Sequence, residues 1–483
     1  MTKQPPSLHS LTRRHFVGAS SLGIGAMALA ALFDRDARGD DAKRTDPLAP
    51  KAPHFAAKAK RVVYLNMTGG PSQLDLFDYK PVLKENDQKP IPPSAVKGIR
   101  FSGMTNLAAA NVLASPWEFK QHGPNGTWLS ELLPGLAGIL DEVALVKSMR
   151  TDEINHVPAQ LLFMTGSPRM GRPVMGSWVT FGLGSECENL PGYVVLSSGI
   201  ADRCGTACWS SGFLPSVYQG VQMRGSGDPV LYLSNPGGID EKLRRKSLDT
   251  LNELNTSSLQ EFNDPEIATR IASYEMAYKM QASVPELMDI SKEPKEMHAL
   301  YGTEPGKSSF ANNCLLARRL LERGVRFVQL NHAPWDHHGS SPGENLALDL
   351  PKVSRACDGP SAALVKDLKA RGLLDSTLVI WGGEFGRSPI LQGKFSKERL
   401  GRDHLGSAYT LWLAGGGVKR GLELGKTDDF GLSVVEDPVH VHDMQATILH
   451  LLGMDHTKLT YRFQGRDYRL TDVHGEVVKK MLA

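Results

Sequence analysis

The alternation of helices and apolar strands from residue 308 onward restricts the fold more than any other feature of this sequence. Short continuous apolar runs at 325–331, 376–381 and 408–416 are typical of buried strands. Amphipathic helices are predicted at 309–324, 359–374 and 442–453, the last with Asp443 as N-cap and Gly453 as its stop. Helices alternating with such strands indicate a parallel sheet covered on both faces. We therefore predict an α/β fold with a doubly wound, mostly parallel sheet sandwiched by helices.

The rest of the chain fits one domain of this type behind an export segment. Arg13 and Arg14 precede a short Gly- and Ala-rich apolar stretch, which is typical of a cleaved twin-arginine signal within residues 1–45. An uncleaved anchor is the alternative, although the stretch is a weak spanning helix. We expect residues 46–483 to form a single domain. Residues 238–300 are predicted to be a charged helical insertion that flanks a site or presents an interaction surface.

The charge balance argues against a nucleic-acid partner. The formal net charge is only +3, and the sequence has no Lys/Arg-rich block or basic stripe with interleaved aromatic residues. We expect a periplasmic or secreted protein that meets the membrane only during export. Cys204 and Cys208 either form a local disulfide in an oxidising compartment or remain buried thiols.

Polar clusters accompany the predicted strands in the positions where open α/β sheets bind ligands, outside the carboxyl ends of the strands. The clusters are Ser72, Asp75 and Asp78 after the strand at 61–67, His332, Asp336, His337 and His338 after 325–331, Glu384 and Arg387 after 376–381, and Arg402, Asp403 and His404 before 408–416. The last cluster precedes its strand, so a loop is expected to carry it back over the sheet edge. We expect the first three clusters to converge, and the fourth is able to join them.

The mixture of imidazole and carboxylate in these clusters indicates a divalent metal site. Such ligands suit Zn²⁺, Mn²⁺ or Fe, whereas carboxylate and water alone suit Mg²⁺ or Ca²⁺. Asp336 and His338 lie on one short loop and are the main predicted ligands, while His332 and His337 are expected to be bystanders. The alternative is a solvated loop, or a histidine that caps a helix.

Two other clusters allow more than one interpretation. Asp403 and His404 are candidate metal ligands, but an Asp-His dipeptide also occurs without one. Glu384 follows an apolar strand and two glycines, which favours a functional carboxylate over a simple salt bridge to Arg387.

Five motifs, taken together, resemble one known family. They are GGPSQLDLFD, NHVPAQLLFMTGSP, WDHHG, GGEFGRSP and GRDH, and they span most of the predicted domain. The set resembles the exported proteins grouped as domain-of-unknown-function family 1501. That family is distantly similar to the alkaline phosphatase and sulfatase superfamily, so the resemblance implies that fold, with a metal centre at the strand ends.

The resemblance also implies roles for individual residues. One metal ion would be held by Asp336, His338 (or His337) and His404, with Asp403 as a further candidate, and a second position would involve Glu384 and Asp75 or Asp78. The second position departs from the superfamily pattern, because Phe385 stands where a histidine is usual and Thr68 where an aspartate is usual. We therefore expect one ion, without distinguishing Zn²⁺, Mn²⁺, Ca²⁺ and Mg²⁺.

The candidate catalytic residues are implied by the same resemblance. The nucleophile position precedes Asn155-His156 and falls near Asp152, which makes Thr151 a candidate, with a bound water as the alternative and His156 as a further catalytic candidate. Arg387 is expected to bind phosphate or sulfate oxygens in place of a lost second metal.

Together these features predict a metal-dependent hydrolase of phosphate or sulfate esters. Its substrate would be an anionic ester, such as one on a sugar polymer. The rival interpretation is a non-catalytic binding or assembly protein that keeps the fold. The sequence pattern does not indicate an oligomeric state.

Overall fold

The computed structural model describes residues 46–199, 204–225, 229–230, 233–262, 264–393, 395–396 and 399–483. The predicted export signal at 1–45 lies outside the described residues. None of the helices described is both long enough and apolar enough to cross a membrane.

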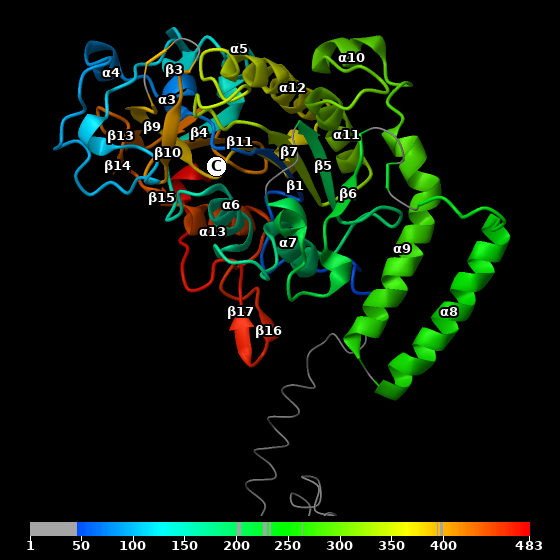
Figure 1. Cartoon of the computed structure of the whole chain (residues 1–483). Coiled ribbons are helices and arrows are strands. Elements are labelled where there is room, and N and C mark those ends of the chain that lie inside the picture. Colours follow the sequence, from blue (N-terminus) through cyan, green and yellow to red (C-terminus); the bar gives the residue numbers. More distant parts are fainter. Residues whose placement is uncertain are drawn as a thin grey trace, which may run out of the picture. The chain divides into compact units, whose positions relative to one another are not determined.

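A mixed, mostly parallel sheet forms the centre of the described structure (Figure 1). Among the described residues it has nine strands, in the order β12 (Leu422–Leu424), β4 (Val143–Arg150), β11 (Tyr409–Ala414), β8 (Thr377–Gly382), β1 (Arg61–Met67), β7 (Phe327–Ala333), β5 (Tyr193–Gly199) and β6 (Val221–Met223), with β15 (Val439–His440) beside β4. β11 runs antiparallel to β4 and β8, and the other pairs are parallel. The predicted α/β fold is confirmed.

The direction of β11 corrects one prediction about the site. Residues that precede an antiparallel strand lie at the edge where the parallel strands end, so no loop has to carry Arg402, Asp403 and His404 back over the sheet. These residues instead form β10 (Arg402–Leu405), which pairs with β9 (Gly386–Leu391) in a separate hairpin.

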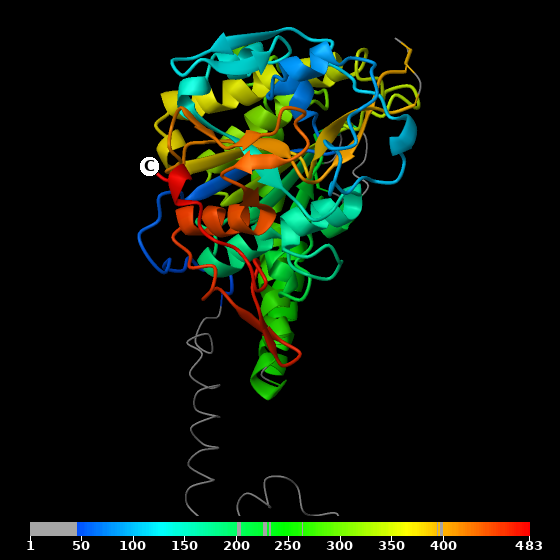
Figure 2. The same cartoon turned by 90° about the vertical axis from the view of Figure 1, so that its left-hand side faces the viewer.

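Helices cover both faces of the sheet. One layer contains α11 (Phe310–Glu322) and α12 (Leu350–Ala370), and the other contains α6 (His156–Thr165), α7 (Met175–Leu183) and α13 (Val441–Leu451). In two perpendicular views the yellow α12 and the orange-red α13 lie on opposite sides of the sheet (Figure 1 and Figure 2). Alternate strand residues fill the two cores: Val63 and Leu65 pack on the α11–α12 side, and Val62 and Tyr64 on the other.

The helix ends follow local sequence, with one correction. Gly166 ends α6 in the left-handed conformation with φ of 70°, which glycine adopts readily. Asp443 is not the N-cap of α13, because His440 takes that place and Asp443 sits three residues later, accepting the His440 N–H in a capping box. Gly453 directly follows the C-cap residue Leu452.

The stretch predicted as a helical insertion contains α8 (Glu241–Phe262), α9 (Pro265–Met288) and α10 (Lys295–Tyr301). α9 packs against α11, and α8 packs on α9 (Figure 1). The smaller elements are α3 (Gln73–Leu76), α4 (Pro81–Glu85), β2 (Phe119–His122), β3 (Thr127–Ser130), α5 (Pro134–Ala137), β13 (Lys426–Thr427), β14 (Val434–Glu436), β16 (Tyr461–Phe463) and β17 (Arg466–Tyr468).

Cys204 and Cys208 form a disulfide, so of the two alternatives for this pair the bridged one holds.

Candidate metal centre

Four side chains from three parts of the chain meet at the carboxyl edge of the sheet. Asp336 and His338 follow β7, His404 lies in β10, and His156 is the first residue of α6. One potential ligand atom from each lies within 4.8 Å of the others, and each residue is at most 9% exposed. The structure thus brings together the predicted ligands Asp336, His338 and His404, and adds His156, which the sequence predicted as a catalytic residue.

Asp336 lies at the middle of this cluster. Its Oδ1 is 2.8 Å from His338 Nε2 and 3.5 Å from His404 Nε2, and its Oδ2 is 3.1 Å from His156 Nε2. The Nε2 atoms of His338 and His404 are 2.9 Å apart. Three imidazole nitrogens and one carboxylate therefore converge on a single point, which is the donor set that borderline divalent metals prefer.

The other ring nitrogen of each histidine determines which nitrogen is left free for a metal. Nδ1 of His404 lies 2.6 Å from the Ile154 carbonyl, Nδ1 of His156 lies 2.7 Å from Glu384 Oε1, and Nδ1 of His338 contacts Gln392 Oε1. Since all three partners are acceptors, each Nδ1 carries the proton, and in the neutral rings each Nε2 has a bare lone pair. Two such lone pairs 2.9 Å apart repel each other unless a cation lies between them. This outer ring of acceptors is the usual support of histidine ligands.

The electrostatics of the cluster keep Asp336 ionised. Burial alone would raise the pKa of Asp336, but the positive charge of Arg387 holds it well below its usual range. Burial, followed by the charge of Arg387, lowers the pKa of His404 to about 4. Burial also acts to lower the pKa of His156, but hydrogen bonds to Asp336 and Glu384 outweigh burial and raise it.

The guanidinium of Arg387, which was expected to bind phosphate or sulfate oxygens, lies among acceptors of the protein itself. Its Nη2 donates to Asp336 Oδ1 at 2.6 Å and to the Gly69 carbonyl, its Nε donates to the Gly70 carbonyl at 2.9 Å, and its Nη1 donates to the Arg402 carbonyl at 3.1 Å. The side chain is only 1% exposed. Because every guanidinium nitrogen is engaged inside the protein, Arg387 orients Asp336 and leaves no nitrogen for a substrate oxygen.

Glu384, predicted at a second metal position, lies behind His156 and outside the four-residue group. Its carboxylate also accepts the Gly69 N–H, at 3.1 and 3.2 Å, and the Gln160 amide at 3.4 Å. Gly69 permits this approach, because its φ is +123° and an added Cβ would lie 2.7 Å from the Asp336 nitrogen. Phe385, where the resemblance expects a histidine, packs on the rings of His156 and His404.

Asp75 and Asp78 lie away from the cluster. Arg402 binds the Asp75 carboxylate with two nitrogens, at 2.7 and 3.0 Å, and Ser72 donates to it at 2.5 Å. Asp78 contacts Thr427 and lies 3.3 Å from Lys80. Both aspartates are thus occupied by other partners.

The remaining predicted ligands also lie outside the group. Asp403 accepts hydrogen bonds from Ser102 at 2.6 Å and Thr105 at 2.8 Å. His332 contacts Ser198 Oγ at 3.0 Å, and the carbonyl of His337 accepts the Arg402 N–H. Burial is the main cause that lowers the pKa of both histidines to about 4. They remain predicted bystanders.

Thr151, the candidate nucleophile, lies just after β4. It lines a hollow of about 610 Å³ with Arg100, Arg150, Asp152 and Ile154 among the other lining residues. Its hydroxyl accepts the Glu153 N–H at 3.4 Å, and within the described part of the chain no hydrogen bond joins it to the four-residue cluster. The hollow and the cluster adjoin at Ile154, whose carbonyl contacts His404.

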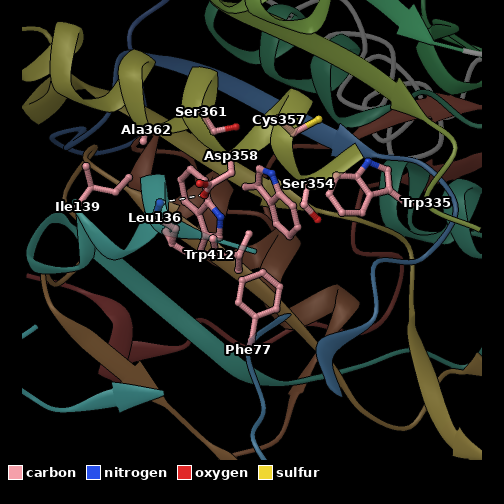
Figure 3. A pocket seen from close by; sticks show the side chains of 12 residues that line it. Phe77, Leu136, Ile139, Trp335, Ser354, Cys357, Asp358, Ser361, Ala362 and Trp412 are labelled. Atoms are coloured by element: carbon pink, nitrogen blue, oxygen red, sulfur yellow. Dashed lines mark hydrogen bonds between the residues drawn. The ribbon is translucent and has the colours of Figure 1, made fainter. Parts of the chain in front are cut away.

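A small cavity beside the cluster shows how the loop after β7, which carries Asp336 and His338, is anchored (Figure 3). Trp335 lines this cavity of about 10 Å³ together with Phe77, Trp412 and Asp358 on α12. Trp335 is buried in the core on the α12 side, and its neighbour Asp336 lies in the cluster. Packing of Trp335 therefore holds the loop that carries Asp336 and His338.

Several supporting residues were not predicted from the sequence. Gln392 and Gln160 contact His338 and Glu384, and the Ile154 carbonyl contacts His404. Gln160 lies inside one of the five motifs, but a glutamine by itself does not indicate a role, and residue type does not reveal a contact made by a backbone carbonyl. His156, in contrast, was predicted as a catalytic residue, and the structure places it as the first residue of α6.

Comparison with solved structures finds remote likenesses. They include the lipoteichoic acid synthase of Listeria monocytogenes (10% identity, 89% of this chain and 79% of that one, TM-score 0.35) and a sulfatase from Pseudoalteromonas sp. (11%, 82% and 68%, TM-score 0.36). A third is the alkaline phosphatase of the Antarctic bacterium TAB5 (11%, 83% and 99%, TM-score 0.30). These values are too low to transfer a residue role or an activity. No curated protein matches the chain.

A family model, by contrast, matches nearly the whole described structure. It covers residues 59–482, which include all four members of the cluster and all the strands of the central sheet. The chain therefore belongs to the protein family of unknown function DUF1501.

Proposed function

We propose that this chain is an exported, metal-dependent hydrolase of phosphate or sulfate esters. One observation carries the proposal: three imidazole Nε2 atoms and the Asp336 carboxylate converge, and the opposite nitrogen of each ring is held by an acceptor. The donor set fits one divalent ion, with Zn²⁺ as the first candidate and Mn²⁺ or Fe as the others. Export rests on the twin-arginine pattern at Arg13 and Arg14.

The hollow beside the cluster supports an anionic substrate. Arg100 and Arg150 both line it, and Arg150 is exposed at the end of β4. Arg100 also donates to the Asp152 carbonyl at 2.7 Å, and this hydrogen bond joins two segments that line the hollow. A guanidinium binds the oxygens of phosphate or sulfate with paired hydrogen bonds.

The residues of the chain would divide the work of hydrolysis. A bound divalent ion would polarise the ester oxygen. Arg387 keeps Asp336 ionised and oriented, Glu384 fixes the ring of His156, and Arg150 draws the anion to the hollow. The attacking oxygen would come from Thr151 or from a water molecule.

Metal analysis of the purified chain, paired with an activity panel, tests this function. We expect about one ion per chain in the wild type and turnover of at least one class among phosphomonoesters, phosphodiesters and sulfate esters. His338→Asn should lose the ion, whereas the matched variant His332→Asn, in the same segment, should keep it. A wild type without metal, or one with metal and no turnover on any of the three classes, would contradict the hydrolase.

The number of ligands gives the second candidate function its support. Catalytic zinc sites hold three protein ligands and keep one position open, while sites with four protein ligands are closed and structural. Here four protein groups converge, and all are buried or nearly so. The second candidate is therefore a non-catalytic binding or assembly protein with one structural metal. It predicts a bound ion, no turnover, and a large loss of stability when a chelator removes the ion.

A further inference from the structure

Helix α8 presents an apolar stripe to solvent. Four of its members are large and exposed: Leu243 (48%), Leu251 (42%), Leu254 (62%) and Phe262 (67%). With Ser247 and Ser258 they occupy about 100° of the helix circumference, because successive residues are about 100° apart. The adjacent side of α8 is already used, since Leu248 is buried and Arg245 pairs with Glu275 on α9. The stripe is thus a second face of α8, separate from the one that packs on α9.

The two serines do not make this face polar. Ser247 Oγ donates to the Leu243 carbonyl at 2.9 Å, and Ser258 Oγ donates to the Leu254 carbonyl at 3.1 Å. Both hydroxyl protons are therefore satisfied within the helix, and covering them leaves no donor without a partner. Small residues at these positions also allow another helix to approach closely.

The order of residues along the stripe is symmetric about its middle. Leu251 and Leu254 lie at equal distances from the point between residues 252 and 253, as do Ser247 and Ser258, and Leu243 and Phe262. When two copies of such a helix lie antiparallel, each member meets its counterpart: leucine against leucine, serine against serine, and Leu243 against Phe262. A two-fold interface requires a self-complementary surface of this kind.

The charges of α8 agree with the same arrangement. Lys242, Arg244, Arg245 and Lys246 lie in the first two turns, and Asp249, Glu253 and Glu261 lie farther along. In the antiparallel register Glu261 of one copy comes level with the stretch between Lys242 and Lys246 of the other, along the same edge of the stripe. Within the described residues, the ion pairs of α8 engage Arg245 with Asp249 and with Glu275, and none engages Lys242, Lys246 or Glu261. A parallel arrangement would instead place like charges together.

We propose that the α8 stripe binds the α8 stripe of a second copy of this chain, antiparallel and about a two-fold axis. One pair of helices is a small interface, so the dimer is expected to be weak and to depend on protein concentration. The hollow next to the metal cluster is lined by residues of other elements, so each copy keeps its own site.

Sedimentation velocity on the whole chain tests the association. We expect the sedimentation coefficient to rise over roughly a hundredfold range of concentration. The double variant Leu251→Glu/Leu254→Glu should stay monomeric throughout, because it buries four carboxylates at the centre of the interface. Val473→Glu, at an apolar position that is 69% exposed, is the matched control and should behave as wild type. A wild type that is monomeric throughout, or a double variant that still dimerises, would overturn the proposal.

Disulfide cross-linking tests the direction of the two helices. In the antiparallel register, chains with Leu243→Cys should cross-link with chains carrying Phe262→Cys when the two are mixed. Leu243→Cys alone should not cross-link, because its two copies lie 19 residues apart along the helix axis, about 28 Å. The wild type controls for the partly exposed Cys187. Cross-linking of Leu243→Cys by itself, without Phe262→Cys, would overturn the antiparallel arrangement.

Discussion

Two buried carboxylate–arginine pairs lie on neighbouring parts of this protein, and they have different surroundings. Asp75 and Arg402 form a bidentate pair at 2.7 and 3.0 Å, and Ser72 donates to the same carboxylate. Asp336 and Arg387 are joined at 2.6 Å, but three imidazoles also reach Asp336. In the first pair, Arg402 and Ser72 occupy the Asp75 carboxylate, and we call it the closed pair. The second leaves nitrogen lone pairs directed at one point.

This difference shows that residue type alone does not define a metal site. Both aspartates follow strands at the same sheet edge and both are buried, so strand order makes them equal candidates. The imidazoles, and the acceptors behind them, distinguish Asp336. A bidentate arginine neutralises Asp75 fully, which removes its affinity for a cation.

Replacing each aspartate should produce the largest contrast. Asp336→Asn is expected to reduce the bound metal from about one ion per chain to almost none, and to abolish any metal-dependent turnover, because the central ligand loses its charge. Asp75→Asn should keep the ion. Plasma mass spectrometry of both purified variants measures the contrast, and equal metal loss in the two would remove the distinction between the pairs.

The closed pair should matter more for stability. Asp75→Asn leaves Arg402 buried without a counter-charge, and breaking a buried pair in this way costs about 3–5 kcal/mol. Urea unfolding of metal-free protein measures this change in the free energy of unfolding. Changing both partners, as in Asp75→Leu/Arg402→Met, should recover part of the loss because no unpaired charge remains. A double variant that is less stable than Asp75→Asn would contradict this explanation of the Asp75–Arg402 pair.

Acid should destabilise the cluster that contains the imidazoles. The pKa of His404 is about 4 in the folded chain, against about 6.5 when unfolded, so the unfolded state binds the extra proton between these values. The stability of the metal-free chain should therefore fall as the pH drops from about 6.5 to about 4, by roughly 3 kcal/mol through His404. His156 acts oppositely, because its raised pKa makes its contribution disappear as the pH rises.

Comparison of variants separates the contribution of His404 to the pH dependence of stability from that of His156. His404→Gln should lose less stability than wild type between pH 6.5 and pH 4, since the position no longer takes up a proton. Urea unfolding of chelator-treated protein at several pH values provides the measurement. Identical pH dependence in the two chains would show that His404 is not held neutral by its surroundings.

The smallest expected effect concerns the support behind the ligands. Glu384→Gln keeps a similar shape but weakens the hydrogen bond that orients His156, and such changes typically cost 10–100-fold in metal affinity. Competition with a coloured chelator measures this affinity. Complete loss of the ion would indicate instead that Glu384 is itself a ligand, and no change would show that the ring of His156 needs no carboxylate.

Much of the fold could be predicted, because continuous apolar strands between amphipathic helices have few arrangements. The direction of β11 could not be predicted, since a buried antiparallel strand has the same apolar run as a parallel one. That one direction places His404 at the sheet edge without a returning loop. The start of α13 at the N-cap residue His440 could not be predicted either, because histidine is an uncommon N-cap residue.

The candidate site was predictable only where its members are neighbours in sequence. Asp336 and His338 lie on one loop, and strand order predicts that His404 can reach them. The role of His156 depends on contacts with Glu384 and Asp336, which are far away along the chain. Glu384 and Asp336 look alike in sequence, because each is an acidic residue after an apolar strand. Only tertiary contacts show that Asp336 faces the three imidazoles and that Glu384 lies behind His156.

Anomalous diffraction from crystals of the whole chain, recorded at the absorption edge of the bound metal, tests the central claim most directly. The account predicts one peak per chain, at about 2.0–2.2 Å from Nε2 of His156, His338 and His404 and from an Asp336 oxygen. Asp75 and Arg402 should remain paired with no peak beside them. Crystals of metal-loaded protein with no peak at this cluster, or with the ion bound at another group of residues, would contradict the account.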